Sequence, residues 1–166
     1  MKSVILFRHG KSDWNANYDH DHNRPLAKRG IRDAKRMGSF LSKIVEIPDL
    51  IISSTALRAK KTIELALENN SWSVKIIYEK GIYEASLRTL IDFLKKQENK
   101  YQCICLVGHE PILSSIIEKV KDKSKIKFPT AAVAKISFDT KEWNKINLSP
   151  NQSELKWFFK PKDLDQ

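Results

Sequence analysis

Two arginines and two histidines of the sequence stand just after short apolar runs. Arg8 and His9 directly follow the first run, Arg58 comes one helical turn after the second, and His109 comes after the fourth. Guanidinium groups bind phosphate oxygens in a bidentate manner, and imidazole can attack phosphorus or transfer a proton. No glycine-rich nucleotide loop or metal-ligand cluster competes with these residues. The pattern therefore indicates metal-free phosphoryl chemistry.

The same apolar runs predict strands, and segments with helical spacing separate them. We expect strands over residues 3–7, 50–52, 74–78, 101–107, 132–138 and 155–159, and 143–148 is a candidate for another. Apolar positions recur at helical spacing over 27–45, 57–67, 87–94 and 112–120. The hydroxyls of residues 53–55 stand where they could cap the second helix.

This alternation predicts an α/β fold. We expect a single three-layer domain with a mostly parallel central sheet, helices on both faces and no large cap insertion. Ligands of such sheets bind beyond the carboxyl ends of the strands. The arginines and histidines should therefore lie together at that edge.

The length and composition agree with one globular domain. We assign all of residues 1–166 to it. Apolar runs stay far below the roughly 18 residues of a membrane span, and the N-terminus lacks the pattern of a secretory signal. Cys103 and Cys105 lie in an apolar run, which favours buried, reduced thiols. These features predict a cytoplasmic protein.

The chain is basic, with 30 Lys and Arg residues against 20 Asp and Glu residues and a net charge of +10. Such a balance suits nucleic acid, an anionic membrane or an acidic substrate. Most of the positive charge is lysine spread among acidic neighbours, which is typical of a solvated surface. We therefore expect no nucleic-acid or membrane partner. A basic nucleic-acid-binding module is the alternative from a different class, and it predicts salt-sensitive binding without turnover.

Several short motifs follow one another along the chain. Residues 7–15 read Phe-Arg-His-Gly-Lys-Ser-Asp-Trp-Asn, 24–26 read Arg-Pro-Leu, 53–59 read Ser-Ser-Thr-Ala-Leu-Arg-Ala, and 107–109 read Val-Gly-His. In this order they resemble the RHG signature and later motifs of the histidine phosphatase superfamily, which includes the phosphoglycerate mutases. The short chain without a large insertion is most similar to the SixA-type phosphohistidine phosphatases. The resemblance covers nearly the whole chain and implies a covalent phosphohistidine intermediate and no cofactor.

The resemblance also implies roles for individual residues. His9 matches the nucleophile, and His109 matches the second histidine of the pocket. Arg8 and Arg58 match the phosphate-binding arginines, which a protonated His109 would assist in stabilising the transition state. Asn15 matches a residue that adds an amide donor in mutases, or it simply caps its loop.

Glu84 follows the third predicted strand and has two interpretations. In mutase-like relatives a glutamate near this place protonates the leaving oxygen, which would make Glu84 a general acid. SixA-type members often lack such an acid, since imidazole leaving a phosphohistidine needs less help than an alkoxide. Alternatively, Glu84 is a carboxylate favoured at a helix N-terminus by the helix dipole.

The segment Asp19–His22 contains residues of metal-ligand type. No further ligand and no i, i+4 helical pair accompany them, so we expect a solvated loop at the mouth of the pocket and no metal site. Lys11, Arg24 and Arg29 could enlarge the positive rim of that pocket. Equally, Arg29 and Arg32 could face water on the first long helix.

The sequence thus predicts a metal-independent phosphatase. The resemblance to SixA implies that it removes phosphate from a phosphohistidine on another protein, such as a phosphotransfer domain. A small phosphomonoester is the alternative substrate within the same superfamily, and Glu84 favours it if it is an acid. A mutase reaction is disfavoured because no insertion encloses a migrating phosphoryl group.

Overall fold

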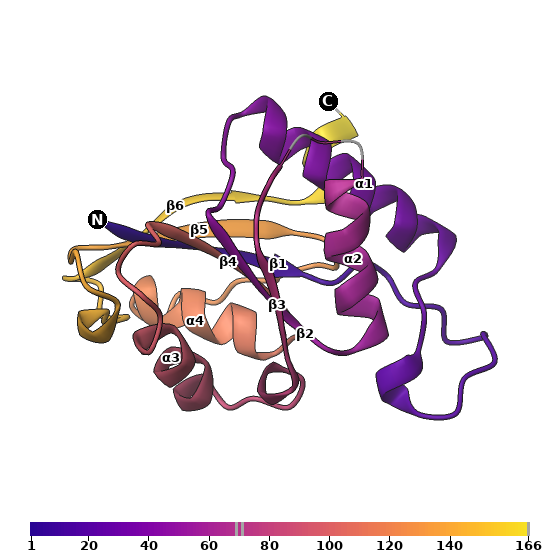
Figure 1. Ribbon diagram of the computed structural model, residues 1–166, viewed down its shortest axis with the longest axis horizontal. Coiled ribbons are helices and arrows are strands. Elements are labelled where there is room, and N and C mark those ends of the chain that lie inside the picture. Colours follow the sequence, from indigo (N-terminus) through magenta and orange to yellow (C-terminus); the bar gives the residue numbers. More distant parts are fainter. Residues whose placement is uncertain (69, 71, 166) are drawn as a thin grey trace.

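One central sheet organises the molecule (Figure 1). The computed structural model describes residues 1–68, 70 and 72–165. Within them, the strands are β1 (Lys2–Arg8), β2 (Leu50–Ser54), β3 (Ile76–Glu79), β4 (Cys103–Gly108), β5 (Val133–Phe138) and β6 (Ser153–Phe159). The helices are α1 (Lys28–Lys43), α2 (Leu57–Leu67), α3 (Leu87–Lys95) and α4 (Ile112–Val120). Short 3-10 turns are η1 (Asp21–Asn23), η2 (Lys80–Ile82), η3 (Trp143–Lys145) and η4 (Pro161–Asp165).

The strand order in the sheet is β3-β2-β4-β1-β5-β6. The strands β1 to β4 run parallel, whereas β5 and β6 pair in the antiparallel sense at one side. A helix links each parallel strand to the next, because parallel neighbours cannot be joined by a tight turn. The predicted mostly parallel α/β sheet is confirmed.

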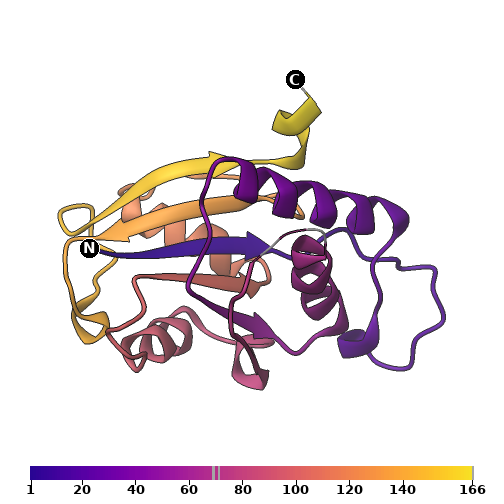
Figure 2. The same cartoon turned by 45° about the horizontal axis from the view of Figure 1, so that its top comes forward.

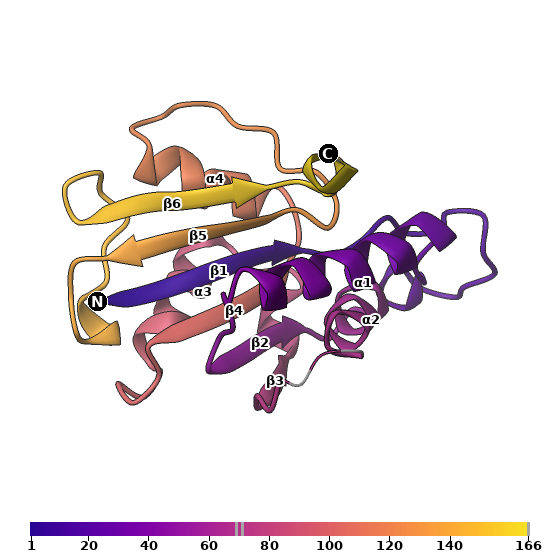
Figure 3. The same cartoon turned by 90° about the horizontal axis from the view of Figure 1, so that it is seen from above.

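Helices cover both faces of the sheet. Alternate residues of a strand point to opposite faces, so Ile5 and Phe7 pack in one cluster with α1 and α2, while Val4 and Leu6 pack in another with α3 and α4. Figures 2 and 3 show the two helix pairs on either side of the strands. The described residues contain no large insertion that could form a cap. The predicted three-layer architecture is therefore confirmed.

Two further features bear on the sequence-based expectations. Cys103 and Cys105 lie on β4 as free thiols, and Cys105 is buried. None of the helices in the described part of the chain is long and apolar enough to cross a membrane.

The strand expected over residues 143–148 is wrong. Trp143 begins the turn η3, and its side chain is fully buried. Its indole Nε1 donates to Tyr101 O at 2.8 Å, and its backbone N–H donates to Asn99 Oδ1 at 2.8 Å. The apolar residues of this segment therefore anchor a turn beside the start of β4 instead of pairing with a strand.

Two glycines hold the loop after β1 against the first turn of α1. A Cβ atom on Gly10 would lie 2.7 Å from the carbonyl oxygen of Gly30, and one on Gly30 would lie 2.2 Å from that of Lys11. Neither distance leaves room for a side chain, so glycine is required for this close backbone approach. Ala27 N–H also donates to Lys11 O at 2.9 Å. Backbone contacts thus fix the residues that follow β1.

Candidate active site

The ends of β1 and β4 place two histidines side by side. Arg8 and Gly108 are register partners in these parallel strands, so the chain leaves both strands at the same edge of the sheet. His9 and His109 follow directly, and their ring centroids are 5.2 Å apart. The structure therefore brings together two residues that are distant in the sequence, at the edge where ligands bind in such sheets.

His9 is arranged as a neutral nucleophile by its own loop. Its Nδ1 lies 2.7 Å from the carbonyl oxygen of Gly10, and because a carbonyl can only accept, Nδ1 carries the proton. The lone pair of the ring is then on Nε2. Burial is the main cause that lowers the pKa of His9 from 6.5 to about 3. His9 is therefore neutral at pH 7 and has the lone pair that an attack on phosphorus requires.

Arg8 and Arg58 supply buried positive charge to the same region. Arg8 donates from Nη1 to Phe128 O at 2.9 Å, and Arg58 donates from Nη1 to Asp21 O at 2.9 Å. Both Nε atoms are buried, and neither has a hydrogen-bond partner among the described residues. A buried cationic donor without an acceptor is costly, so these groups favour the binding of an anion.

The expectation of a protonated His109 concerns the transition state, and the protein without a bound phosphoryl group shows the ring in a different state. Burial, followed by the charge of Arg58, lowers its pKa to about 4, so His109 is neutral at pH 7 when no anion is bound. Its Nε2 lies 2.8 Å from Ser54 Oγ, and its buried Nδ1 has no partner within the described chain. A phosphate dianion beside the ring would favour the protonated form.

A carboxylate of the loop after β1 lies beside Arg58. Asp21 accepts from Arg58 Nη2 at 3.1 Å and from Tyr83 Oη at 2.5 Å, and it forms an ion pair with Arg24. The hydrogen bond from Tyr83 contributes most to lowering the pKa of Asp21 to about 2, so this carboxylate is ionised at pH 7. His22 packs edge-on against Tyr83, with the ring centroids 4.9 Å apart.

The segment Asp19–His22 is only partly the solvated loop that the sequence predicts at the pocket mouth. It lies at the pocket, as expected, but Asp21 and His22 are bound to the residues that line it. The described residues contain no group of three or more side chains that could hold a metal ion.

A family model described as the histidine phosphatase superfamily (branch 1) matches residues 4–90, which include Arg8, His9 and Arg58. The chain belongs to the histidine phosphatase superfamily. It is an enzyme of the phosphatase class, and the resemblance of its motifs to this family is confirmed.

Relatives in sequence include an uncharacterized protein of Mycobacterium leprae, 28% identical over 93% of this chain and 99% of its own length. A 2,3-bisphosphoglycerate-dependent phosphoglycerate mutase of Erythrobacter litoralis is 36% identical, over 41% of this chain and 31% of the mutase.

Solved structures resemble the whole chain. One, described as a candidate phosphohistidine phosphatase SixA from Agrobacterium tumefaciens, is 26% identical over 96% of this chain and 98% of its own, with a TM-score of 0.78. The protein histidine phosphatase SixA complexed with tungstate has the same fold, with a TM-score of 0.81 at 18% identity over 98% of this chain and 99% of its own.

The hydroxyl of Ser54, at the end of β2, contacts a histidine of the site instead of capping α2, and the hydroxyl of Thr62, within α2, contacts the loop after β1. The helix is preceded by Ala56, whose side chain cannot cap it. Ser54 Oγ accepts from the N–H of Ala56 at 3.1 Å and contacts His109. Thr62 Oγ1 accepts from the N–H of Gly10 at 2.9 Å and donates to Arg58 O at 2.6 Å. Thr62, which the sequence analysis missed, thus links the nucleophile loop to the helix that carries Arg58.

Asn15 and Arg24 differ in burial within the loop after β1. Asn15 is exposed, and its backbone N–H donates to Asp13 Oδ1 at 3.0 Å, which agrees with the alternative of a local loop contact. Arg24 is buried: its Nε donates to Ser12 Oγ at 2.9 Å, and its guanidinium lies 3.6 Å from the centre of the Trp14 ring. Arg24 is therefore packed inside the loop after β1, and it does not form part of an exposed positive rim of the pocket.

Glu84 lies beside the second histidine. Together with Tyr83, His109 and Glu110 it lines a cavity of about 370 Å³. Ser86 is the N-cap of α3 and accepts from the N–H of Thr89, which places Glu84 before the first turn. Glu84 therefore stands two residues before the N-cap of α3 and also lines the cavity beside His109, so both interpretations remain predictions.

Proposed function

We propose that this phosphatase removes the phosphoryl group from a phosphohistidine on another protein, by way of a phosphorylated His9. The observation that carries the proposal is the Nδ1–Gly10 hydrogen bond, because it leaves Nε2 of a neutral imidazole as the nucleophile. The likeness over 96% of the chain to a protein described as a candidate phosphohistidine phosphatase supports the substrate class.

In the first step, His9 Nε2 forms a bond to phosphorus while the P–N bond of the substrate breaks. The electron pair of that bond stays with the substrate imidazole, which leaves as a neutral ring when its far nitrogen carries a proton. The transition state is loose and places negative charge on three oxygens of the phosphoryl group. The Nε–H donors of Arg8 and Arg58 are available to stabilise that charge.

In the second step, water attacks phosphorus and the P–Nε2 bond breaks. Its electron pair returns to His9, and the water gives up a proton to the phosphate or the solvent. While Nε2 carries the phosphoryl group and Nδ1 keeps its proton, the ring is cationic and therefore a good leaving group. The carbonyl of Gly10 holds that proton in place. Inorganic phosphate and the original His9 are the products.

The proposed steps use protein groups alone, so we propose that neither a metal nor a cofactor takes part. The phosphatase would act as one domain over residues 1–166 in the cytoplasm, where Cys103 and Cys105 stay reduced.

A small phosphomonoester is the second candidate substrate, and one observation favours it. Glu84 lines the cavity beside His109, where it could protonate an alkoxide leaving group. A phosphohistidine does not require such a donor.

A substrate comparison in the presence of EDTA tests both candidates. We would measure kcat/KM for a histidine-phosphorylated phosphotransfer domain, a sugar phosphate and p-nitrophenyl phosphate, with His9→Ala as the inactive control. The proposal expects the phosphorylated protein to be preferred by at least about tenfold, which corresponds to about 1.4 kcal/mol. A preference for the sugar phosphate would favour the alternative, and loss of all activity in EDTA would contradict the metal-free mechanism.

A further inference from the structure

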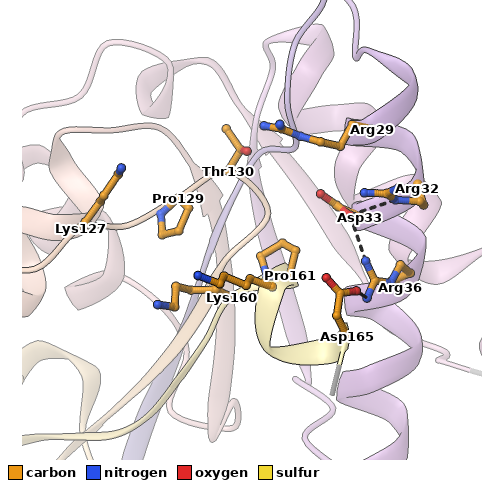
Figure 4. A pocket seen from close by; sticks show the side chains of 11 residues that line it. Arg29, Arg32, Asp33, Arg36, Lys127, Pro129, Thr130, Lys160, Pro161 and Asp165 are labelled. Carbon is orange, nitrogen blue, oxygen red and sulfur yellow. Dashed lines mark hydrogen bonds and ion pairs between the residues drawn. The ribbon is translucent and has the colours of Figure 1, made fainter.

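A groove with strongly positive walls lies outside the phosphate pocket (Figure 4). It has a volume of about 400 Å³ and runs between α1, the segment 127–130 and the C-terminal turn η4. Its basic side chains are Arg29, Arg32, Arg36, Lys127, Lys160 and Lys162. Its acidic side chains are Asp33 and Asp165.

The two acidic residues neutralise only part of this charge. Asp33 pairs with Arg32 and Arg36, and Asp165 pairs with Arg36. Among the described residues, no carboxylate lies within 4.0 Å of the charged groups of the other four cations, Arg29, Lys127, Lys160 and Lys162. Like charges around one groove repel each other, so an anionic partner would relieve this repulsion.

The wall of the groove is connected to the catalytic loop. Phe128, between Lys127 and Pro129, accepts the hydrogen bond of Arg8 through its carbonyl. Ala131 N–H donates to His9 O at 3.0 Å. On the opposite wall, Arg29 precedes Gly30, which touches the loop after His9. A partner held in the groove would therefore lie next to the phosphate pocket.

The cations are distributed and do not converge on one point. Figure 4 shows Lys127 and Lys160 across the groove from the arginines of α1. A single phosphate is best bound by donors that converge on its oxygens. Separated cations on three chain segments instead match several carboxylates spread over a protein surface.

We propose that this groove binds an acidic surface of the phosphorylated protein and thereby directs its phosphohistidine to His9. The inference rests on the proposed function, since it names the surface by which that substrate is recognised. It also gives a function to basic residues of the chain that take no part in the proposed reaction.

Binding of an acidic peptide tests the groove without relying on turnover. The probe is a fluorescently labelled polyglutamate peptide that carries no phosphate, titrated at low salt. The double variant Lys127→Gln/Lys160→Gln removes two groove cations, and Lys95→Gln/Lys119→Gln removes the same charge from α3 and α4 on the other face of the sheet. We expect about tenfold weaker binding for the groove variant and wild-type binding for the control.

Kinetics with a histidine-phosphorylated phosphotransfer domain give the second measurement. We expect KM to rise about tenfold in Lys127→Gln/Lys160→Gln, while kcat and the hydrolysis of p-nitrophenyl phosphate stay unchanged. Equal loss of peptide binding in both double variants would overturn the proposal, because it would reflect net charge alone. An RNA oligonucleotide that binds the groove more tightly than the peptide would also overturn it. Failure to turn over any phosphohistidine would contradict the proposed function, but the peptide titration would still decide whether the groove binds acidic chains.

Discussion

Asp21 accepts two hydrogen bonds from the guanidinium group of Arg58. Arg58 donates from Nη1 to the backbone carbonyl of Asp21 and from Nη2 to its carboxylate. This pairing fixes the plane of the guanidinium and leaves the buried Nε–H for another acceptor. The same carboxylate accepts from Tyr83, so it also ties the loop after β1 to the wall near His109. Asp21 therefore acts as a positioning residue for a phosphate-binding arginine.

Substitution of Asp21 tests this role. Asp21→Asn keeps the shape of the side chain but replaces charge-assisted hydrogen bonds by neutral ones, so we expect kcat to fall about tenfold, or about 1.4 kcal/mol. Because the change also removes negative charge from the pocket, inhibition by inorganic phosphate should not weaken. Asp19→Asn is the matched control, since Asp19 is exposed and bonds to Asn23 and His20 within the loop. Equal kcat values for the two variants would rule out the positioning role.

The nature of the intermediate gives a direct test of His9. Rapid quenching during turnover should trap phosphate that is labile in acid and stable in alkali, on the peptide that contains His9. His9→Ala should abolish both the label and the activity, whereas His20→Ala, which changes an exposed histidine, should preserve both. Undiminished turnover by His9→Ala would disprove the covalent mechanism.

Glu84 separates the two substrate classes. With phosphohistidine we expect Glu84→Gln to lower kcat by less than about threefold, because imidazole leaves without a donor. With an alkyl phosphate, loss of a general acid would cost about 10²–10⁴-fold. Glu98→Gln changes an exposed carboxylate elsewhere and serves as the control. A large loss with phosphohistidine as well would show that Glu84 has a different function.

Burial of His9 and His109 makes the stability of the fold depend on pH. Their pKa values are lowered from 6.5 to about 3 and about 4, chiefly by burial. Between these values and 6.5 the unfolded chain binds protons that the folded chain does not, so stability falls as the pH falls from 6.5 towards 4. Each histidine contributes a slope of at most about 1.4 kcal/mol per pH unit.

Urea unfolding at several pH values between about 7 and about 5 measures this slope. His9→Asn should give a shallower pH dependence than the wild type, and His20→Asn should leave it unchanged. If all three proteins show the same slope, the buried histidines are not the source of the acid sensitivity.

Sequence reasoning predicted those parts of the site that lie next to strand ends. Arg8, His9 and His109 follow apolar runs directly, so the sheet topology alone places them at one edge. Asp21 could not be assigned in this way, because its partners Arg58 and Tyr83 are 37 and 62 residues away in the sequence. Its pairing depends on how the loop folds back over α2, which no local pattern reports.

The error at residues 143–148 has a similar origin. An apolar run shows that side chains are buried, but it does not show what the backbone pairs with. Trp143 is buried because its indole and its N–H bond to Tyr101 and Asn99, both in the connection before β4. The hydroxyl of Ser54 illustrates the same limit, since a short polar side chain near a helix start can serve either the helix or a neighbouring site.

The pairing of Arg8 with Gly108 sets a dimension of the active site. Neighbouring strands are held about 4.8 Å apart by their backbone hydrogen bonds. His9 and His109 extend two such strands, and their ring centroids are 5.2 Å apart. The spacing of the two strands therefore brings both imidazoles within reach of one phosphoryl group bound beside them. Side-chain substitutions around the two histidines can change the charge of the site and its hydrogen bonds. The separation of the backbone positions of His9 and His109 depends on the pairing of β1 with β4 and should not change.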